Sequence, residues 1–148
     1  MGNADTEHVI KIPEAIDEVI GLTGKSCKAV PAGTPPLDDA TCLILQKRVG
    51  LDWKLTTAAD GNARLRREFT VKNFSAGIEL FSRIAKVADA DNHHPDLHLE
   101  GWNKASVELW THTVSGLSEN DFIVAAKINE LGFEDLKKAQ KKKQRFWA

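Results

Sequence analysis

Two runs of alternating apolar and polar residues constrain the fold of this 148-residue chain most strongly. Leu51, Trp53 and Leu55 alternate with polar residues, and a second alternating run at residues 65–71 follows an Asp-Gly-Asn turn at residues 60–62. Because successive side chains in a strand point to opposite faces, this pattern predicts a β-hairpin. Residues 97–114 predict a second, less regular hairpin.

Helical spacing predicts elements before, between and after the two hairpins. Residues 39–49 are typical of a short helix. Asn73 can cap a second helix that ends near Ala90, and Ser118, with Asp121 three residues later, can cap a third. The predicted core-facing stripe of the second helix is Phe74, Ile78, Phe81, Ala85 and Ala88.

These elements predict an α+β fold in the order α-β-β-α-β-β-α. The simplest arrangement is a four-stranded antiparallel sheet with helices packed on one face. A run rich in proline at residues 30–36 predicts a boundary. We therefore expect an N-terminal extension at 1–37, partly helical or flexible, a single domain at 38–133, and a basic tail at 134–148 that extends the last helix.

Composition narrows the classes of function and the compartment. The net charge of −1 gives no overall attraction to nucleic acid or to a membrane surface, and no apolar run reaches the length of a membrane span. The two cysteines are too few for a disulfide framework. The first forty residues contain seven acidic residues and no arginine, which is unlike an organelle transit peptide. We expect a cytoplasmic protein, with the basic tail as an argument for the nucleus.

The histidines are the main candidates for chemistry, because four of the five lie within twenty residues. His93 and His94 follow the predicted end of a helix, and strand alternation places His112 on the open face of the sheet. If these imidazoles converge beside an aromatic wall from Trp102 or Trp110, they form a site for moving protons on a flat heteroaromatic substrate. A metal site that includes His98, or surface histidines without a role, remain alternatives from the spacing alone.

One spaced set of residues links the histidines to their neighbours: Asp89, His93, His94, Pro95, Trp102, His112 and Asp121. In this spacing, residues 38–131 resemble the pterin-4a-carbinolamine dehydratase family. The resemblance implies an enzyme that dehydrates a 4a-hydroxy-tetrahydropterin to quinonoid dihydropterin in tetrahydrobiopterin recycling, with no cofactor and no metal. It also implies a homodimer or homotetramer. The alternative function is a dimerisation coactivator with a transcription-factor partner and no direct nucleic-acid binding.

The resemblance also assigns site residues. It implies His93, His94 and His112 as the catalytic residues. One difference stands out, because Asp89 replaces a longer glutamate found in many relatives. Structural roles remain alternatives for three residues: Asp121 as a helix cap, Asp89 as a solvated side chain and Trp53 as core. The implied substrate-binding residues are Asn92, His93, His94, Trp110, Thr111, His112, Thr113, Asp121, Asp89 and Trp53.

Overall fold

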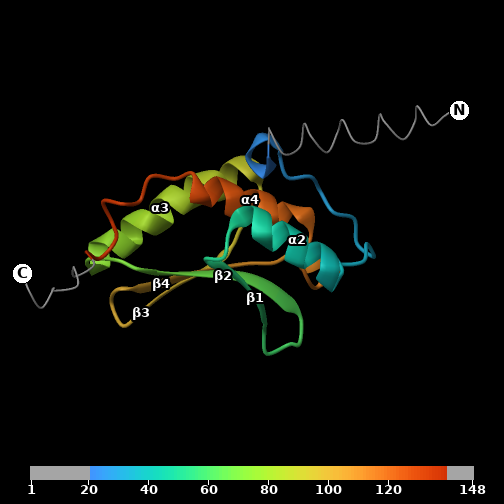
Figure 1. Ribbon diagram of the computed structural model, residues 1–148, viewed down its shortest axis with the longest axis horizontal. Helices are drawn as coiled ribbons and strands as arrows, with labels where there is room; N and C mark the ends of the chain where they lie inside the picture. The colour runs from blue at the N-terminus through green and yellow to red at the C-terminus, as the bar shows by residue number, and fades with distance from the viewer. Residues whose placement is uncertain (1–20, 140–148) are drawn as a thin grey trace, which may run out of the picture.

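The computed structural model describes residues 21–139, which form a sheet covered on one face by helices (Figure 1). The four strands are antiparallel and lie in the order β1-β2-β4-β3. The predicted α+β architecture is therefore confirmed. In chain order the elements are the 3-10 turn η1 (Leu22–Gly24), α2 (Asp39–Val49), β1 (Trp53–Thr57), β2 (Ala63–Thr70), α3 (Phe74–Asp91), β3 (Asp96–Glu100), β4 (Lys104–Leu109), the 3-10 turn η2 (His112–Val114) and α4 (Glu119–Asn129).

Side-chain caps set where the helices begin. The Asp38 carboxylate accepts the Thr41 N–H at 2.8 Å at the start of α2, and Asn73 accepts the Ala76 N–H at 2.8 Å at the start of α3. Ser118 and Asp121 form a capping box at the start of α4. Such caps satisfy N–H groups that have no partner within the first turn of a helix.

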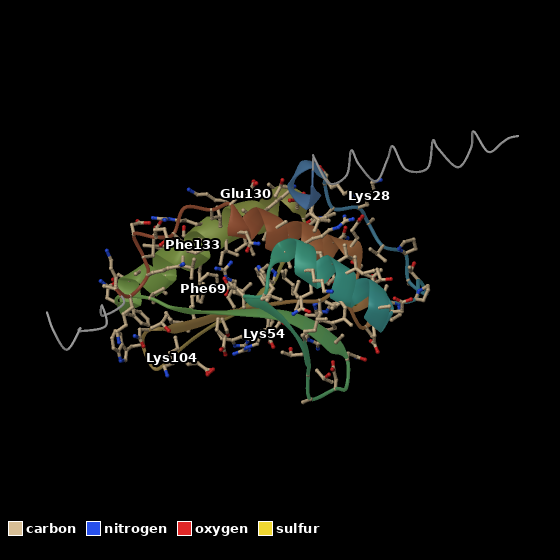
Figure 2. The ribbon with its side chains drawn as sticks, in the orientation of Figure 1. Lys28, Lys54, Phe69, Lys104, Glu130 and Phe133 are labelled. Atoms are coloured by element: carbon tan, nitrogen blue, oxygen red, sulfur yellow. The ribbon has the colours of Figure 1, made fainter. Side chains whose placement is uncertain are left out.

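The core lies between the sheet and the helices (Figure 2). Phe69 from β2 and Phe133 after α4 meet there edge to face, with ring centroids 5.4 Å apart. Lys54 and Lys104 lie on the opposite, open face of the sheet (Figure 2). The alternation that predicted the hairpins thus separates a buried face from a solvated one.

The apolar stripe of α3 differs from the predicted one. The helix buries Ala76, Gly77, Leu80, Ile84 and Ala88 against the sheet. Phe74 and Ile78 are 55% and 51% exposed. A Cβ on Gly77 would lie 2.9 Å from the Leu99 side chain, so the small residues allow α3 to approach the sheet closely. Close approach favours the stripe with small residues over the one with large side chains.

The second hairpin is shorter than predicted. Strand β4 ends at Leu109, and beyond it Thr111 makes a single bridge with Gly116. His112 begins η2, so the prediction that it lies within a strand was wrong. The tight return to Gly116 takes the chain out of the sheet, because Ser115 adopts a left-handed conformation with φ 51°.

The folded unit extends beyond the predicted limits of 38 and 133. Leu22 is 4% exposed within the core, and Leu136 is 6% exposed. Residues 134–139 carry no helix, contrary to the predicted helix extension; instead the Lys138 N–H donates to the Thr70 carbonyl at 3.0 Å. Residues 1–20 of the predicted N-terminal extension and residues 140–148 of the basic tail lie outside the described residues.

Candidate active site

A pocket of about 510 Å³ lies where the end of α3, the end of β4 and the start of α4 meet. Its size suits a small heteroaromatic ligand. The pocket lies beyond Leu109, the last residue of β4, so His112 borders it from a 3-10 turn and not from a strand. Its wall combines four parts of the chain: residues 27–30, residues 91–94, residues 110–113 and Asn120.

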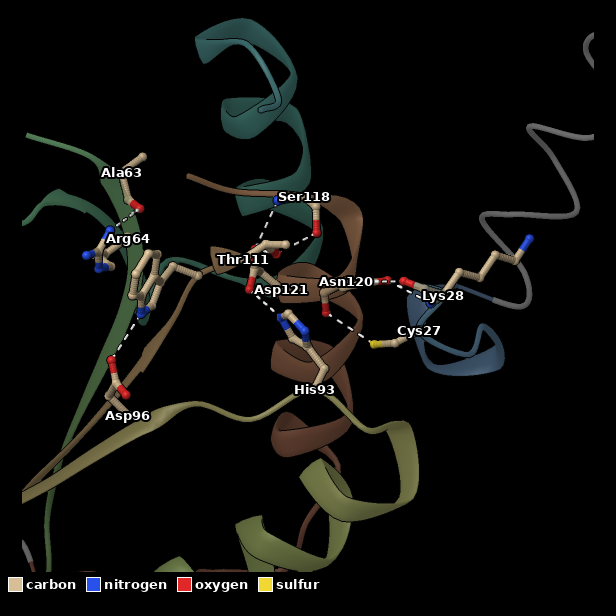
Figure 3. Close-up of polar contacts among 11 residues, drawn as sticks. Cys27, Lys28, Ala63, Arg64, His93, Asp96, Thr111, Ser118, Asn120 and Asp121 are labelled. Atoms are coloured by element: carbon tan, nitrogen blue, oxygen red, sulfur yellow. Dashed lines mark hydrogen bonds and ion pairs between the residues drawn. The ribbon is translucent and has the colours of Figure 1, made fainter. Parts of the chain in front are cut away.

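His93 is held by a buried carboxylate (Figure 3). The end of α3 places it there, because Asn92 adopts the left-handed conformation of a helix C-cap and the His93 N–H donates to the Ala88 carbonyl. His93 Nε2 lies 2.7 Å from Asp121 Oδ1, and the two side chains are 13% and 0% exposed.

The other oxygen of Asp121 also accepts hydrogen bonds. Asp121 Oδ2 accepts the Thr111 hydroxyl at 2.8 Å and the Ser118 N–H at 2.9 Å. These two donors occupy Oδ2, and Oδ1 faces His93. The carboxylate in turn fixes the His93 proton on Nε2, which leaves Nδ1 as the ring nitrogen that can exchange a proton with a ligand.

His112 is held by stacking instead. Its ring lies against the Trp110 indole with centroids 3.7 Å apart and an interplanar angle of 29°. The Trp110 Nε1–H donates to Asp96 Oδ2 at 3.0 Å, which orients the indole. Trp110 is thus the aromatic wall, whereas Trp102 lies in the turn between β3 and β4.

His94 and Asp89 form an outer pair. His94 Nε2 lies 2.9 Å from Asp89 Oδ1, with side chains 56% and 74% exposed. His94 lines the pocket together with Asn92, Thr111 and Thr113, and Asp89 lies outside the lining. The shorter aspartate therefore still reaches its histidine, although exposed ion pairs contribute little to stability.

Trp53 and His98 also lie outside the pocket lining. Trp53 is 0% exposed, and its Nε1–H donates to Asn129 Oδ1 at 2.7 Å within the core. It is a core residue rather than a pocket wall. His98 lies on β3, with Nε2 3.6 Å from Glu108, because strand alternation turns it to the open face.

Residues 27–30 form a wall that the sequence did not indicate. The Asn120 side chain holds them, since its Oδ1 accepts the Lys28 N–H at 3.0 Å and its Nδ2–H donates to the Lys28 carbonyl at 2.6 Å. Asp91 Oδ1 accepts the Cys27 N–H at 3.3 Å, and Asp91 Oδ2 accepts the Lys127 ammonium at 2.7 Å. An extended loop has no periodic pattern of apolar residues. Only Asn120 and Asp91, the two side chains that bind this loop, could have indicated it.

The Cys27 thiol in this wall is not a nucleophile. Burial, followed by the nearby Asp91 carboxylate, raises the pKa of Cys27 to about 12. The thiol is therefore protonated at neutral pH, and only thiolates are strong nucleophiles. The site is instead suited to acid–base chemistry on its imidazoles.

Residues 21–139 contain neither a group of metal-ligating side chains nor a helix that could span a membrane. In this part of the chain, no three His, Cys, Asp or Glu side chains are grouped so that they could hold a metal ion. None of the described helices is both long and apolar enough to cross a membrane.

Known proteins with similar sequences include a mitochondrial pterin-4-alpha-carbinolamine dehydratase 2 of Arabidopsis thaliana, 50% identical over 66% of this chain and 51% of that protein. A chloroplast protein of the same plant, a probable enzyme of the same kind, is 41% identical over 100% of this chain and 64% of its own length. A protein of the bacterium Marinobacter nauticus with the same enzyme name is 42% identical over 74% of this chain and 96% of its own. The chain thus spans about half to two thirds of the two plant relatives.

Solved structures and family profiles agree with these relatives. The crystal structure of a transcriptional coactivator/pterin dehydratase from Brucella melitensis matches with a TM-score of 0.55 and 28% identity, over 64% of this chain and 95% of that one. The sequence profile described as Pterin 4 alpha carbinolamine dehydratase matches residues 35–131, which contain His93, His112 and Asp121. The chain therefore belongs to the pterin-4-alpha-carbinolamine dehydratase family.

Proposed function

We propose that this chain dehydrates a 4a-hydroxy-tetrahydropterin to the quinonoid dihydropterin, as part of tetrahydrobiopterin recycling. One observation carries the proposal: His93, oriented by Asp121, and His112, oriented by Trp110, border the same pocket. Family membership and relatives named as dehydratases support it.

The reaction needs one proton donor and one proton acceptor. The C4a–O bond breaks with its electron pair on oxygen, and one imidazolium protonates that oxygen to release water. The other imidazole takes the N5 proton, and the electron pair of the N–H bond becomes the second bond between C4a and N5. No atom is oxidised or reduced overall, so the side chains supply all that the reaction needs.

We assign the two proton transfers to His93 and His112 and substrate positioning chiefly to His94. His93 meets the requirement for a fixed proton carrier, because Asp121 binds one nitrogen and leaves the other for the ligand. His94 is exposed and paired with an exposed aspartate, which suits a binding role more than a catalytic one.

The test is a rate measurement with synthetic 4a-hydroxy-tetrahydropterin and purified protein. Because carbinolamines also lose water spontaneously, the uncatalysed rate must be subtracted. We expect turnover that is saturable in substrate and proportional to protein concentration. A rate equal to the uncatalysed one would contradict the proposal.

We further propose that the chain forms a homodimer or homotetramer. Strands β1 and β3 are edges of the sheet, and unpaired edges favour pairing or covering. Exposed apolar side chains on α3 and α2 support this, with Phe74, Ile78 and Ile44 each more than half exposed. Light scattering tests it, and a 16 kDa particle would contradict it.

The same helical surface is the basis of the second candidate function, a coactivator that binds a transcription factor. The Brucella protein is named both as a transcriptional coactivator and as a pterin dehydratase, and the exposed Phe74 and Ile78 on α3 can contact another protein.

The cellular compartment is a separate question. The sequence predicts the cytoplasm, whereas the two plant relatives are named as mitochondrial and chloroplast proteins. Imaging of the full-length protein decides between them.

A further inference from the structure

A buried arginine lies behind the Trp110 wall, outside the pocket. Arg64 is 6% exposed, and its Cζ lies 3.8 Å from the centroid of the Trp110 ring. The sheet register brings the two together, because Leu65 pairs with Leu109 and the next positions along these strands are Arg64 and Trp110. Residues directly opposite each other on neighbouring strands are in contact distance.

Arg64 and His112 occupy opposite faces of the same indole. The His112 ring lies 3.7 Å from the Trp110 ring, and the Arg64 guanidinium lies 3.8 Å from it. Two planar groups cannot both lie within 4 Å of one ring centre on the same face, because their atoms would overlap. The three side chains therefore form one stack, with His112 at the pocket end and Arg64 at the other.

The inner end of the stack is anchored on two sides. Arg64 Nη2–H donates to Asp60 Oδ2 at 2.9 Å, and Arg64 Nη1–H donates to the Ala63 carbonyl at 3.2 Å. The Trp110 Nε1–H donates to Asp96 Oδ2 at 3.0 Å (Figure 3). These bonds fix the plane and the rotation of the indole on which His112 rests.

Stacking is all that orients the His112 ring within the described residues. Neither of its ring nitrogens makes a hydrogen bond to residues 21–139. His93, in contrast, has Asp121. The orientation of His112 therefore depends on the orientation of Trp110, and that depends on Arg64 and Asp96.

We propose that Arg64 is a positioning residue of the active site that acts on His112 through Trp110. Arg64 lies outside the pocket lining, so we assign it no contact with the substrate. Its effect is to keep the imidazole at the angle and distance that proton transfer requires. This inference rests on the proposed function for its effect on rate, but the geometry of the stack can be tested without activity.

Arg64→Met tests the proposal, because methionine keeps the apolar stem and removes the planar cation. We expect kcat to fall by about three- to tenfold with KM nearly unchanged, because cation–π contacts of this kind contribute about that factor and small misplacements slow proton transfer. In NMR spectra, the His112 ring protons should lie upfield in the unaltered protein because of the indole ring current. In the variant they should move toward the values of an unstacked imidazole.

Two further variants control for general damage to the fold. Asp96→Ala removes the other anchor of the indole and should change the His112 signals and kcat in the same direction as Arg64→Met. Arg66→Met is the matched control, because Arg66 lies on the same face of β2 and pairs with Glu68 and Glu108 rather than with Trp110. It should change neither readout.

The outcomes separate this inference from the proposed function. An inactive unaltered protein would contradict the dehydratase function, and the NMR signals would still decide the stack. A loss of kcat in Arg64→Met with unchanged His112 signals would overturn positioning, as would shifted signals with full activity. Shifted signals together with reduced kcat and a constant KM would support it.

Discussion

The two histidines assigned to proton transfer are held in different ways. His93 is mostly buried, and its orientation comes from a directional hydrogen bond to Asp121, which is 0% exposed. His112 is exposed, and its orientation comes from the face of the Trp110 ring. A hydrogen bond fixes both the ring and its tautomer, whereas a stack fixes the ring plane and leaves both nitrogens available. The position of the ring proton is thus defined for His93 and is not defined for His112.

The largest expected effect on kcat is that of removing the imidazole ring of His93 or of His112. His93→Ala and His112→Ala should each lower kcat by about 10²–10⁴, the usual contribution of one positioned acid or base. His94→Ala should act mainly on KM, because we assign it to binding. Initial rates corrected for spontaneous dehydration measure this. If both His93→Ala and His112→Ala keep more than about half of kcat at pH 7, the histidines are not the catalysts.

Asp121→Asn tests the hydrogen bond that orients His93 and leaves the stack of His112 on Trp110 unchanged. The asparagine amide cannot accept every hydrogen bond that the carboxylate accepts, so the His93 tautomer is no longer fixed. We expect kcat to fall by about 10- to 100-fold, less than for loss of the ring, and the free energy of unfolding to fall by about 1–3 kcal/mol, because a buried group loses its partner. Urea denaturation measures the second quantity.

Asp89→Asn is the matched control for Asp121→Asn. It makes the same chemical change beside the other adjacent histidine, but this carboxylate is 74% exposed. Its effect on the free energy of unfolding should stay below about 1 kcal/mol, as for other surface ion pairs. Equal losses in the two variants would mean that burial of Asp121 is not what distinguishes His93.

How much of this could be predicted varies with the kind of signal. Periodicity and caps predicted the order of elements, the helix at Asp39–Val49 and the Asn73 cap. Periodicity could not choose between the two apolar stripes of α3, because the choice depends on how closely the helix approaches Leu99. The alternation of residues also continued past Leu109, so the turn that carries His112 was not visible in the sequence.

The candidate site, like the fold, was predicted only in part from the sequence. Clustering alone did not separate His98 from His93, His94 and His112, but the family resemblance named only the last three. The pocket is lined by these three, and His98 lies beside Glu108. The wall at residues 27–30 was assigned to an extension outside the domain. Its contacts join positions more than sixty residues apart, such as Cys27 to Asp91, and no local pattern encodes such a pairing.

The wall at residues 27–30 should affect binding more than chemistry. Asn120→Ala removes both hydrogen bonds to the Lys28 backbone, which should loosen this wall and raise KM by about three- to tenfold with kcat retained, as one or two uncharged hydrogen bonds contribute. Glu119→Gln is the control, because it weakens an exposed pair with Lys25 in the same segment without touching the pocket. Equal KM values in Asn120→Ala and the unaltered protein would show that this wall does not contact the substrate.

The smallest expected effect is that of metal removal, and it tests whether His93 and His112 are held independently. A shared metal ion would draw the nitrogens of His93 and His112 toward one point, and the contrast between hydrogen bond and stack would disappear. Two of the nitrogens are already engaged by carboxylates, since His93 Nε2 lies 2.7 Å from Asp121 and His94 Nε2 lies 2.9 Å from Asp89. A zinc site needs three or four converging ligands within about 2.0–2.3 Å of the ion, and this arrangement of rings does not provide them. Full activity should therefore survive exhaustive chelation, with elemental analysis of the same sample as the check; stoichiometric zinc, lost together with activity, would replace acid–base catalysis by a metal site.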